Sequence, residues 1–226
     1  MLGLLLWVSV LPLSSGYALD RNILSGPEIS DQRARAVLET VEAKLHDVQS
    51  YRCTLSTLCI LDNKREERSY EYAFHRPKSI HMKILRGPDQ GSTLVYREGC
   101  VVVRPGGLFS FLRQTFEPGH PRVTTIRGGR VDQTDFWSIV DLMKTATCIL
   151  RYEGQENVRG NVTDVLVLTQ RTAFSSGDYQ KGRFWVERDS GLIVKYELYD
   201  KEDELAFRQT HEEVQFNPGL PQYFFQ

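Results

Sequence analysis

The chain has 226 residues, of which 41% are hydrophobic and 25% charged, a globular composition that excludes the collagen-like and disordered classes. With 28 basic against 29 acidic residues, the net charge is -1, and this balance argues against a nucleic-acid partner because such surfaces need a basic excess. The length fits one ordinary domain or two very small ones, and it is sufficient for a single core.

The first eighteen residues form a segment distinct from the rest of the chain. Residues 4–13 are an apolar run, residues 12–16 break it, and small residues near Ala18 suit a signal peptidase. The run is shorter than the roughly twenty residues of a membrane-spanning helix. We therefore predict a secretory signal over residues 1–18 and a single domain over residues 19–226. Residues 1–3 carry no Lys or Arg, so a membrane anchor stays as the alternative.

The clearest helical pattern covers residues 27–48. Apolar residues recur there at helical spacing, and charged residues occupy the other faces. Two starts fit the sequence, a capping box from Ser25 to Glu28 or a cap at residues 30–31. The apolar stripe predicts a helix that docks on a sheet.

Strand patterns then follow at about ten-residue spacing, joined by turn signals, which predicts an antiparallel meander without βαβ units. These strands are expected over residues 51–61, 67–75, 80–84, 93–97 and 100–104. The first carries apolar residues on both parities near its end, as a strand covered on both sides does.

The rhythm stops at residue 105, and no period holds as far as residue 130. The segment nevertheless contains five large apolar side chains: Leu108, Phe109, Phe111, Leu112 and Phe116. Loops of this length in compact domains are often functional. The segment either plugs one end of the core or acts as a lid or a membrane-touching flap.

A second helix is predicted over residues 134–146, with Asp132 or Thr134 as its cap. Further strands are expected over residues 149–152 and 162–170. The last quarter, from residue 183, then reads as a meander of three strands with turns at 189–191 and 200–204. In the final strand, residues 205–216, the apolar parity shifts, which predicts a β-bulge near His211.

Four cysteines, Cys53, Cys59, Cys100 and Cys148, would occupy an oxidising compartment after export. Cys53 and Cys59 are too far apart along one strand to bridge each other. A bridge from either to Cys100 or Cys148 and a set of buried unpaired thiols are both compatible with the sequence.

Motifs of catalysis and metal binding are missing from the sequence. It has no GxSxG, HExxH, CxxC or phosphate-binding glycine loop, and its five histidines are scattered without ligand spacing. We therefore predict no catalytic residue, no metal ligand and no cofactor, with an enzyme of another type as a minor alternative.

Three short motifs, in this order, resemble a known family. They are Phe74-His75-Arg76-Pro77 followed by Ile80-His81-Met82, then Leu94 to Gly99 with Val101 and Val103, then Phe184 to Asp200 with the closing segment 217–225. With the export signal, the long helix and the apolar insertion, they are similar to the bacterial periplasmic lipoprotein-carrier superfamily. That group includes the LolA-like carrier, its LolB-like outer-membrane acceptor and RseB-like stress sensors.

The resemblance implies an α+β fold, in which a strongly curved, unclosed antiparallel sheet of about ten strands forms a half-barrel with helices covering its concave face. In this family acyl chains lie between sheet and lid. An Arg at the turn before Pro ties the lid to the sheet, and Arg76 matches it, although a solvated turn residue is the alternative. Segment 105–130 departs from the carrier by its length and its glycines.

On this basis we expect an apolar lipid site between lid and sheet. The residues expected to line it are Tyr96, Phe109, Phe111, Leu112, Phe136, Val140, Met143, Phe184, Val186, Val194 and Tyr196. The alternative is that these residues simply form a filled core. The resemblance implies a monomeric periplasmic carrier of lipid or lipoprotein acyl chains between an inner-membrane donor and an outer-membrane acceptor. A sensor that binds a membrane signalling protein is the alternative.

Overall fold

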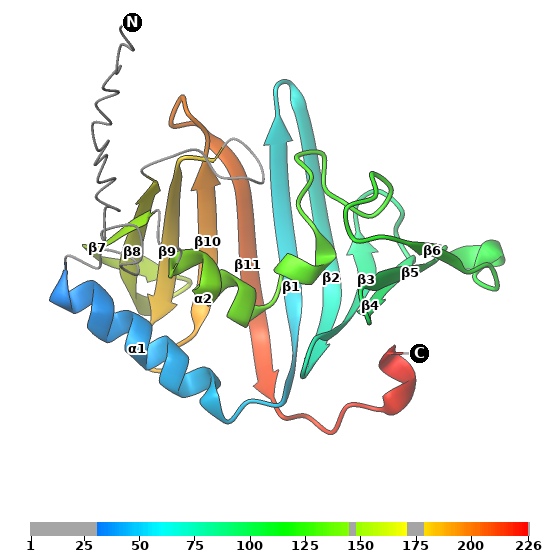
Figure 1. The fold of residues 1–226 in the computed structure, drawn as a ribbon, viewed down its shortest axis with the longest axis horizontal. Helices are drawn as coiled ribbons and strands as arrows, with labels where there is room; N and C mark the ends of the chain where they lie inside the picture. The colour runs from blue at the N-terminus through cyan, green and yellow to red at the C-terminus, as the bar shows by residue number, and fades with distance from the viewer. Residues whose placement is uncertain (1–30, 145–147, 171–178, 226) are drawn as a thin grey trace, which may run out of the picture.

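The computed structural model describes residues 31–144, 148–170 and 179–225, so the expected signal segment 1–18 lies outside the described residues. One antiparallel sheet dominates the fold, and its eleven strands follow the order β6-β5-β4-β3-β2-β1-β11-β10-β9-β8-β7 (Figure 1). The strands are β1 Ser50–Leu61, β2 Lys64–His75, β3 Ser79–Arg86, β4 Thr93–Arg97, β5 Cys100–Arg104, β6 Gln114–Phe116, β7 Cys148–Val158, β8 Asn161–Gln170, β9 Lys181–Glu187, β10 Ile193–Tyr199 and β11 Leu205–Phe216. The sheet is strongly curved and unclosed, and helices cover its concave face, as the family resemblance implied.

The sheet is built from two meanders that meet at its centre. Strands β1 to β6 form one and β7 to β11 the other, and β1 pairs with β11 to join them. The register runs from Tyr51 opposite Phe216 to Cys59 opposite Phe207. The short strand β6 lay in a stretch where we expected no strand, because three residues are too few to show a period of two.

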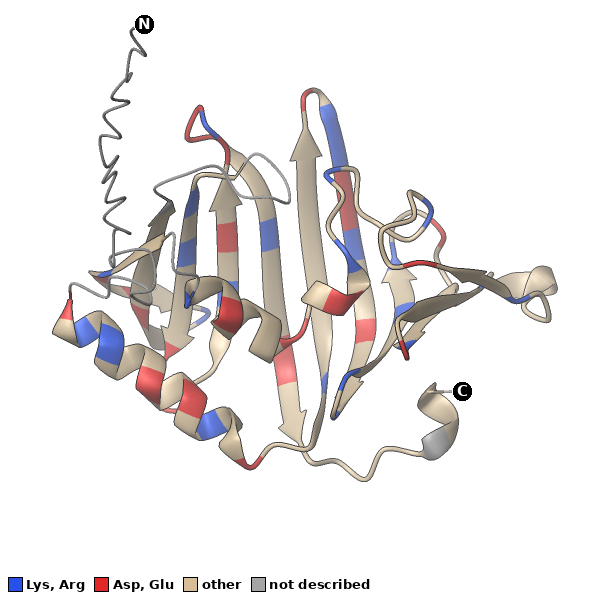
Figure 2. Cartoon of the chain, viewed as in Figure 1, with Lys and Arg blue, Asp and Glu red and all other residues tan. Residues whose placement is uncertain are grey.

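Helix α1 (Gln32–His46) uses the second of its two predicted starts. The Asp31 side chain accepts a 2.9 Å hydrogen bond from the Arg33 backbone N–H and one of 2.8 Å from the Tyr152 N–H of β7. These two bonds, that from Tyr152 first, lower the pKa of Asp31. The cap therefore also docks the helix on the sheet, with Ala34, Leu38 and Val41 buried beneath it. Its outer face carries charges of both signs (Figure 2).

Helix α2 (Phe136–Met143) begins two residues after the predicted start at residue 134. Asp135 is its N-cap, accepting a 3.0 Å hydrogen bond from the Ser138 backbone N–H. Thr134, which we expected as a cap, instead bonds Val131 through its hydroxyl. In Figure 1 both helices lie on the same face of the sheet.

Two irregularities set the direction of side chains in the last strands. Val194 is an extra residue where β10 pairs β9, since Ile193 faces Val186 and Lys195 faces Trp185. In β11 the predicted bulge near His211 is confirmed: the register with β1 shifts between Glu212 and Gln215, and Glu213 has φ 55.

Cys53, Cys59 and Cys100 form no disulfide in the structure. Cys53 and Cys59 are buried and free, and Cys100 is exposed and free, so none of the bridges considered for Cys53 or Cys59 forms. Burial raises the pKa of the Cys53 thiol, which makes it an inert core residue. Within the described residues, no helix has the length and apolar character needed to cross a bilayer.

Candidate functional site

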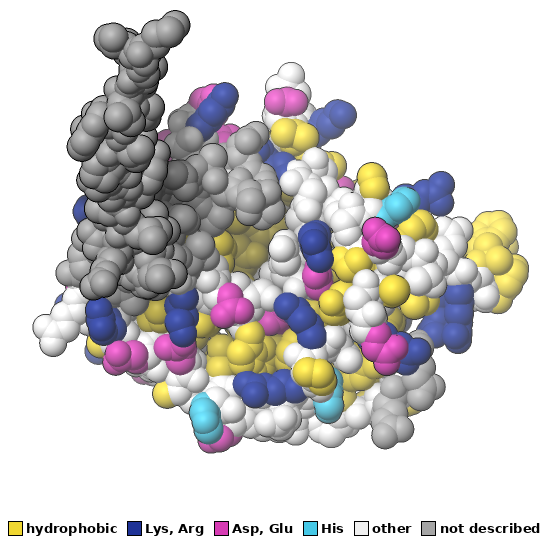
Figure 3. Space-filling view, viewed as in Figure 1, with side chains coloured by type: hydrophobic (Ala, Val, Ile, Leu, Met, Phe, Trp, Pro, Cys, Tyr) yellow, Lys and Arg dark blue, Asp and Glu magenta, His cyan; other side chains and the backbone are white. Residues whose placement is uncertain are grey.

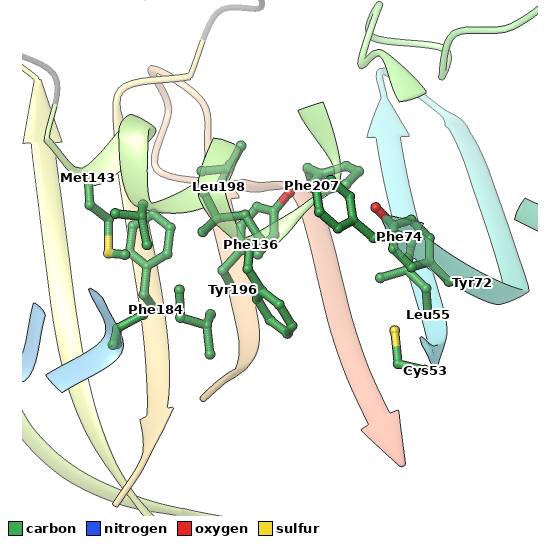
Figure 4. Packing of buried hydrophobic residues seen from close by; sticks show 14 of the residues in the cluster. Cys53, Leu55, Tyr72, Phe74, Phe136, Met143, Phe184, Tyr196, Leu198 and Phe207 are labelled. Atoms are coloured by element: carbon green, nitrogen blue, oxygen red, sulfur yellow. The ribbon is translucent and has the colours of Figure 1, made fainter. Parts of the chain in front are cut away.

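Beneath α2 the concave face is filled by closely packed side chains. Phe136 and Met143 of α2 point at the sheet, where Phe184 of β9 lies (Figure 4). Val140 of α2 and Val186 of β9 belong to the same buried cluster. None of these side chains is more than 6% exposed. For these five residues the structure therefore matches the filled-core alternative, and they leave no room for a ligand among themselves.

A cavity of about 450 Å³ lies beside this core, between the sheet and residues 123–143, which we call the cover segment. Its volume falls in the range of roughly 300–1,000 Å³ typical of small-molecule sites. The apolar lining comes from strands β2, β3, β4, β10 and β11, from the cover segment and from Tyr179, which lies just before β9. Its residues are Tyr70, Met82, Leu94, Val123, Val131, Ile139, Leu142, Tyr179, Tyr196, Leu198 and Phe207. The rest of the lining is polar and comes mainly from the cover segment. The site is thus a chamber between sheet and cover whose wall is more apolar than polar.

Of the residues predicted for the site, Tyr196 lines the cavity. Tyr96 packs against the core from β4 without lining the cavity. Val194 was expected to face the core, but the fully buried residue at this point of β10 is Ile193. The extra residue in β10 reverses which residues face the core, relative to the alternation seen in the sequence. Phe109, Phe111 and Leu112 are exposed at the end of the β5–β6 hairpin and do not line the cavity.

The charged residues that line the cavity are matched by neighbouring carboxylates. Arg130 donates to both oxygens of Asp132 at 2.9 and 2.6 Å. Arg127 lies 3.4 Å from Asp200, and Arg68 lies 3.4 Å from Glu66. Because these charges are already balanced, the chamber offers its hydrophobic walls, not an unpaired ion, as the main attraction for a ligand.

A tight turn at residues 125–129 positions the side chain that attaches the cover segment to the sheet. The Thr125 backbone and hydroxyl accept hydrogen bonds from Gly128 and Gly129, and Gly128 has φ 78, which glycine adopts at little cost. The turn presents Arg127, whose guanidinium donates to the Ile60 carbonyl at the end of β1 and pairs with Asp200. One side chain therefore fastens the cover to two strand ends.

A second attachment lies at the start of α2. Lys78, in the β2–β3 turn, donates to the Ser138 hydroxyl at 3.1 Å and lies 3.6 Å from the buried Asp135 carboxylate. The Ser138 hydroxyl in turn donates to Asp135 at 2.7 Å. The N-cap of α2 is thus tied to the sheet by a charged group at the edge of the cavity.

A buried polar network joins the floor of the cavity to its cover. Gln209 of β11 donates to the Thr134 carbonyl and to His211 Nε2, both at 3.0 Å, and accepts from the Tyr196 hydroxyl at 3.3 Å. His211 Nδ1 lies 2.9 Å from the Ile193 carbonyl. A neutral imidazole with its proton on Nδ1 satisfies both contacts, and burial lowers the pKa of His211 to about 4.

Arg76 lies where the resemblance placed a latch. Its guanidinium donates to the Leu45 carbonyl at the end of α1 (3.4 Å) and stacks over the Trp137 ring of α2 (4.7 Å). Arg76 therefore contacts both helices from the β2–β3 turn. These contacts link the β2–β3 turn to the end of α1 and to α2.

Sequence reasoning missed most of the cavity wall. Arg127, Val131 and Tyr179 lie in stretches without periodicity, so nothing in the sequence shows which way they face. Gln209 did carry a signal, because it occupies an inward position between Phe207 and His211 in a strand whose other face is polar. A polar residue at an inward position predicts a buried hydrogen-bond network.

No protein-family model and no curated protein matches the chain. Its fold is similar to solved structures at low sequence identity. MucB, an RseB-like protein, matches with a TM-score of 0.51 and 16% identity over 89% of this chain and 64% of MucB. Lipoprotein LppX from Mycobacterium tuberculosis matches with a TM-score of 0.50 and 14% identity, over 84% of this chain and 98% of LppX. An uncharacterized conserved protein from Thermus thermophilus matches with a TM-score of 0.52 and 13% identity, over 84% of this chain and 91% of that protein. The resemblance seen in the motifs is therefore confirmed for the fold.

Proposed function

We propose that this protein is an exported, periplasmic carrier that holds acyl chains of a lipid or lipoprotein in the cavity beneath the cover segment. The observation that carries the proposal is the chamber of about 450 Å³, with hydrophobic walls and paired charges. Its fold, shared with the lipoprotein LppX, supports the same conclusion. An inner-membrane donor and an outer-membrane acceptor would load and unload it.

The energetics agree with hydrocarbon as cargo. Each buried methylene contributes about 0.8 kcal/mol, so a chain of about twelve methylenes supplies roughly 10 kcal/mol before ordering costs. Release requires the cover to move, and a few polar contacts of about 1 kcal/mol each hold it: those of Arg127, Lys78 and Gln209. Movement of residues 123–134, the turns before α2, would open the chamber and leave Phe136, Val140 and Met143 of α2 packed on the sheet.

The cavity walls give no reason to propose catalysis. Asp132 is held by Arg130, and the other carboxylate in the wall, Asp141, lies on α2 and has contacts of its own. General acid–base chemistry needs a titrating group directed at a substrate, so binding is the function that these walls support.

Lipid extraction and mass spectrometry of the purified full chain test the proposal. We expect bound lipid in the parent protein and at least about tenfold less in Leu142→Arg, which places a charge in the chamber from a half-buried position of α2. Leu94→Arg, on β4, should act in the same way. Leu85→Arg is the matched control, because Leu85 is 37% exposed and does not line the cavity. Repeated absence of lipid in the parent protein would count against the carrier.

A regulator is the second candidate, because the fold also matches MucB, which has been solved in complex with MucA. Capture of a single-span signalling protein from detergent-solubilised cells, without transfer of lipid between vesicles, would favour the regulator. Lipid transfer without such a complex would favour the carrier.

A further inference from the structure

A group of exposed hydrophobic side chains occupies the end of the β5–β6 hairpin. Leu108, Phe109, Phe111 and Leu112 are 90%, 62%, 75% and 41% exposed, and we call them the tip cluster. They form the protruding hydrophobic group at the right of Figure 3, where Figure 1 shows the hairpin end. The other exposed large hydrophobic side chains of the described residues are Leu85, Val162 and Tyr223, one each on β3, β8 and the C-terminal segment.

The backbone holds the tip cluster outward. Ser110 N–H donates to the Gly107 carbonyl at 3.2 Å, and Leu112 N–H donates to the Phe109 carbonyl at 2.9 Å, so the tip consists of two closed turns. At its base Gly106 donates to the Ser92 hydroxyl, and a Cβ at Gly106 would lie 2.8 Å from the Gly91 backbone. The tip is therefore ordered and anchored against the β3–β4 turn before it meets any partner.

Basic residues flank the tip cluster along the chain. Arg104 ends β5, Arg113 follows the cluster, and Arg122 reaches back to the Gln114 side chain at 3.4 Å. Glu117 is the only acidic residue between positions 104 and 122, whereas the whole chain has a net charge of -1. The hairpin thus has a local basic excess beside its hydrophobic end, and Figure 2 shows basic residues on this side of the molecule.

We propose that the tip cluster inserts into the surface of a bilayer that contains anionic lipids. A narrow projection with two phenylalanines and two leucines can enter the boundary between head groups and acyl chains, where apolar area is buried. Arginines just behind it then lie at the level of the phosphates, where each cation gains attraction. None of the four residues lines the cavity, so the inference stands apart from the cargo.

Vesicle flotation with the full chain tests this inference. We expect the parent protein to float with phosphatidylcholine vesicles that contain phosphatidylglycerol, and Phe109→Ser with Phe111→Ser to weaken binding at least about tenfold. Arg113→Gln should weaken it about fivefold, and only when phosphatidylglycerol is present. Tyr223→Ser and Val162→Ser are matched controls, exposed hydrophobic residues on other elements, and should leave binding unchanged.

Three results would overturn the inference. One is a parent protein that does not float with phosphatidylcholine vesicles, whether or not they contain phosphatidylglycerol. Another is equal loss of binding in the tip and control variants. The third is loss of self-association in the tip variant, measured by analytical ultracentrifugation, without any loss of vesicle binding, because the tip would then be a contact between copies. Circular dichroism checks that each variant is folded, which the exposure of these side chains leads us to expect.

Discussion

The central strands have a packed end and a hollow end, and the two differ in what covers them. In β2, Tyr72 and Phe74 lie in the closed core near α2, whereas Tyr70 lines the cavity. In β11, the His211 ring packs at a tilt against Phe136, with 4.5 Å between ring centres, whereas Phe207 lines the cavity. The packed end is covered by Phe136, Val140 and Met143 of α2. The hollow end is covered by the turns before α2 together with Ile139 and Leu142 of that helix.

This difference shows how one sheet can be both a stable core and a container. A helix with an apolar stripe supplies side chains at regular spacing that fill the concave face. The turns of residues 123–134 are attached by polar side chains, such as Arg127, which bridge over the sheet instead of filling the space below. The container therefore depends on a cover that is fastened at its edges.

The largest expected effect compares two residues of the same helix. Phe136→Ala removes a fully buried ring from the packed end and should lower the free energy of unfolding by roughly 3–5 kcal/mol. Leu142→Ala changes the cavity side of α2, where space already exists, and should cost less than about 1 kcal/mol. Urea unfolding of lipid-free protein measures both. Equal losses would show that the two ends are packed alike.

Acid should weaken the packed end through His211. Its pKa is lowered from 6.5 to about 4 in the folded protein by burial. Between these values the unfolded chain binds the proton and the folded chain does not, so the free energy of unfolding falls as the pH is lowered, by up to about 3 kcal/mol. Unfolding of His211→Phe across this pH range should show a smaller decline than the parent protein. His75→Gln, at an exposed position, serves as control, and a parental slope in His211→Phe would contradict the account.

A smaller effect is expected at the latch. Arg76→Met keeps much of the aliphatic stem but removes the contact with the Trp137 ring and the bond to Leu45, at a cost of about 1 kcal/mol. We expect faster release of bound lipid, measured by stopped-flow transfer to vesicles. Arg52→Met, on the outer sheet surface beside Gln215, is the control and should leave the release rate unchanged. Equal release rates in all three proteins would make Arg76 a structural residue without a role in opening.

Much of the fold could be predicted because its strands are long and alternating. The apolar stripe of α1 and the change of apolar parity in β11 are local sequence patterns. The first correctly predicted a helix and the second a β-bulge. The pairing of β1 with β11 joins residues far apart in sequence, so only the resemblance could imply an unclosed sheet around it. Local pattern also misjudged Val194, because one extra residue exchanges the two faces of a strand.

The site was harder to predict because its walls belong to turns. The exposed Phe109 and the buried Val131 both come from the aperiodic stretch or its border, and hydrophobicity alone cannot tell a wall from a protruding tip. Their directions depend on long-range anchors such as Gly106 against Gly91 and Arg127 against Ile60. Such contacts exist only once the sheet has formed.

The most direct test of the central claim is to locate the cargo. The full chain would be loaded with a fatty acid that carries a photoreactive diazirine on its chain, irradiated, digested and mapped by mass spectrometry. The account predicts cross-links at residues of the hollow end, such as Met82, Leu94 and Leu142. Cross-links confined to Phe109 and Phe111 at the hairpin tip, or none above an irradiated control without loading, would contradict it.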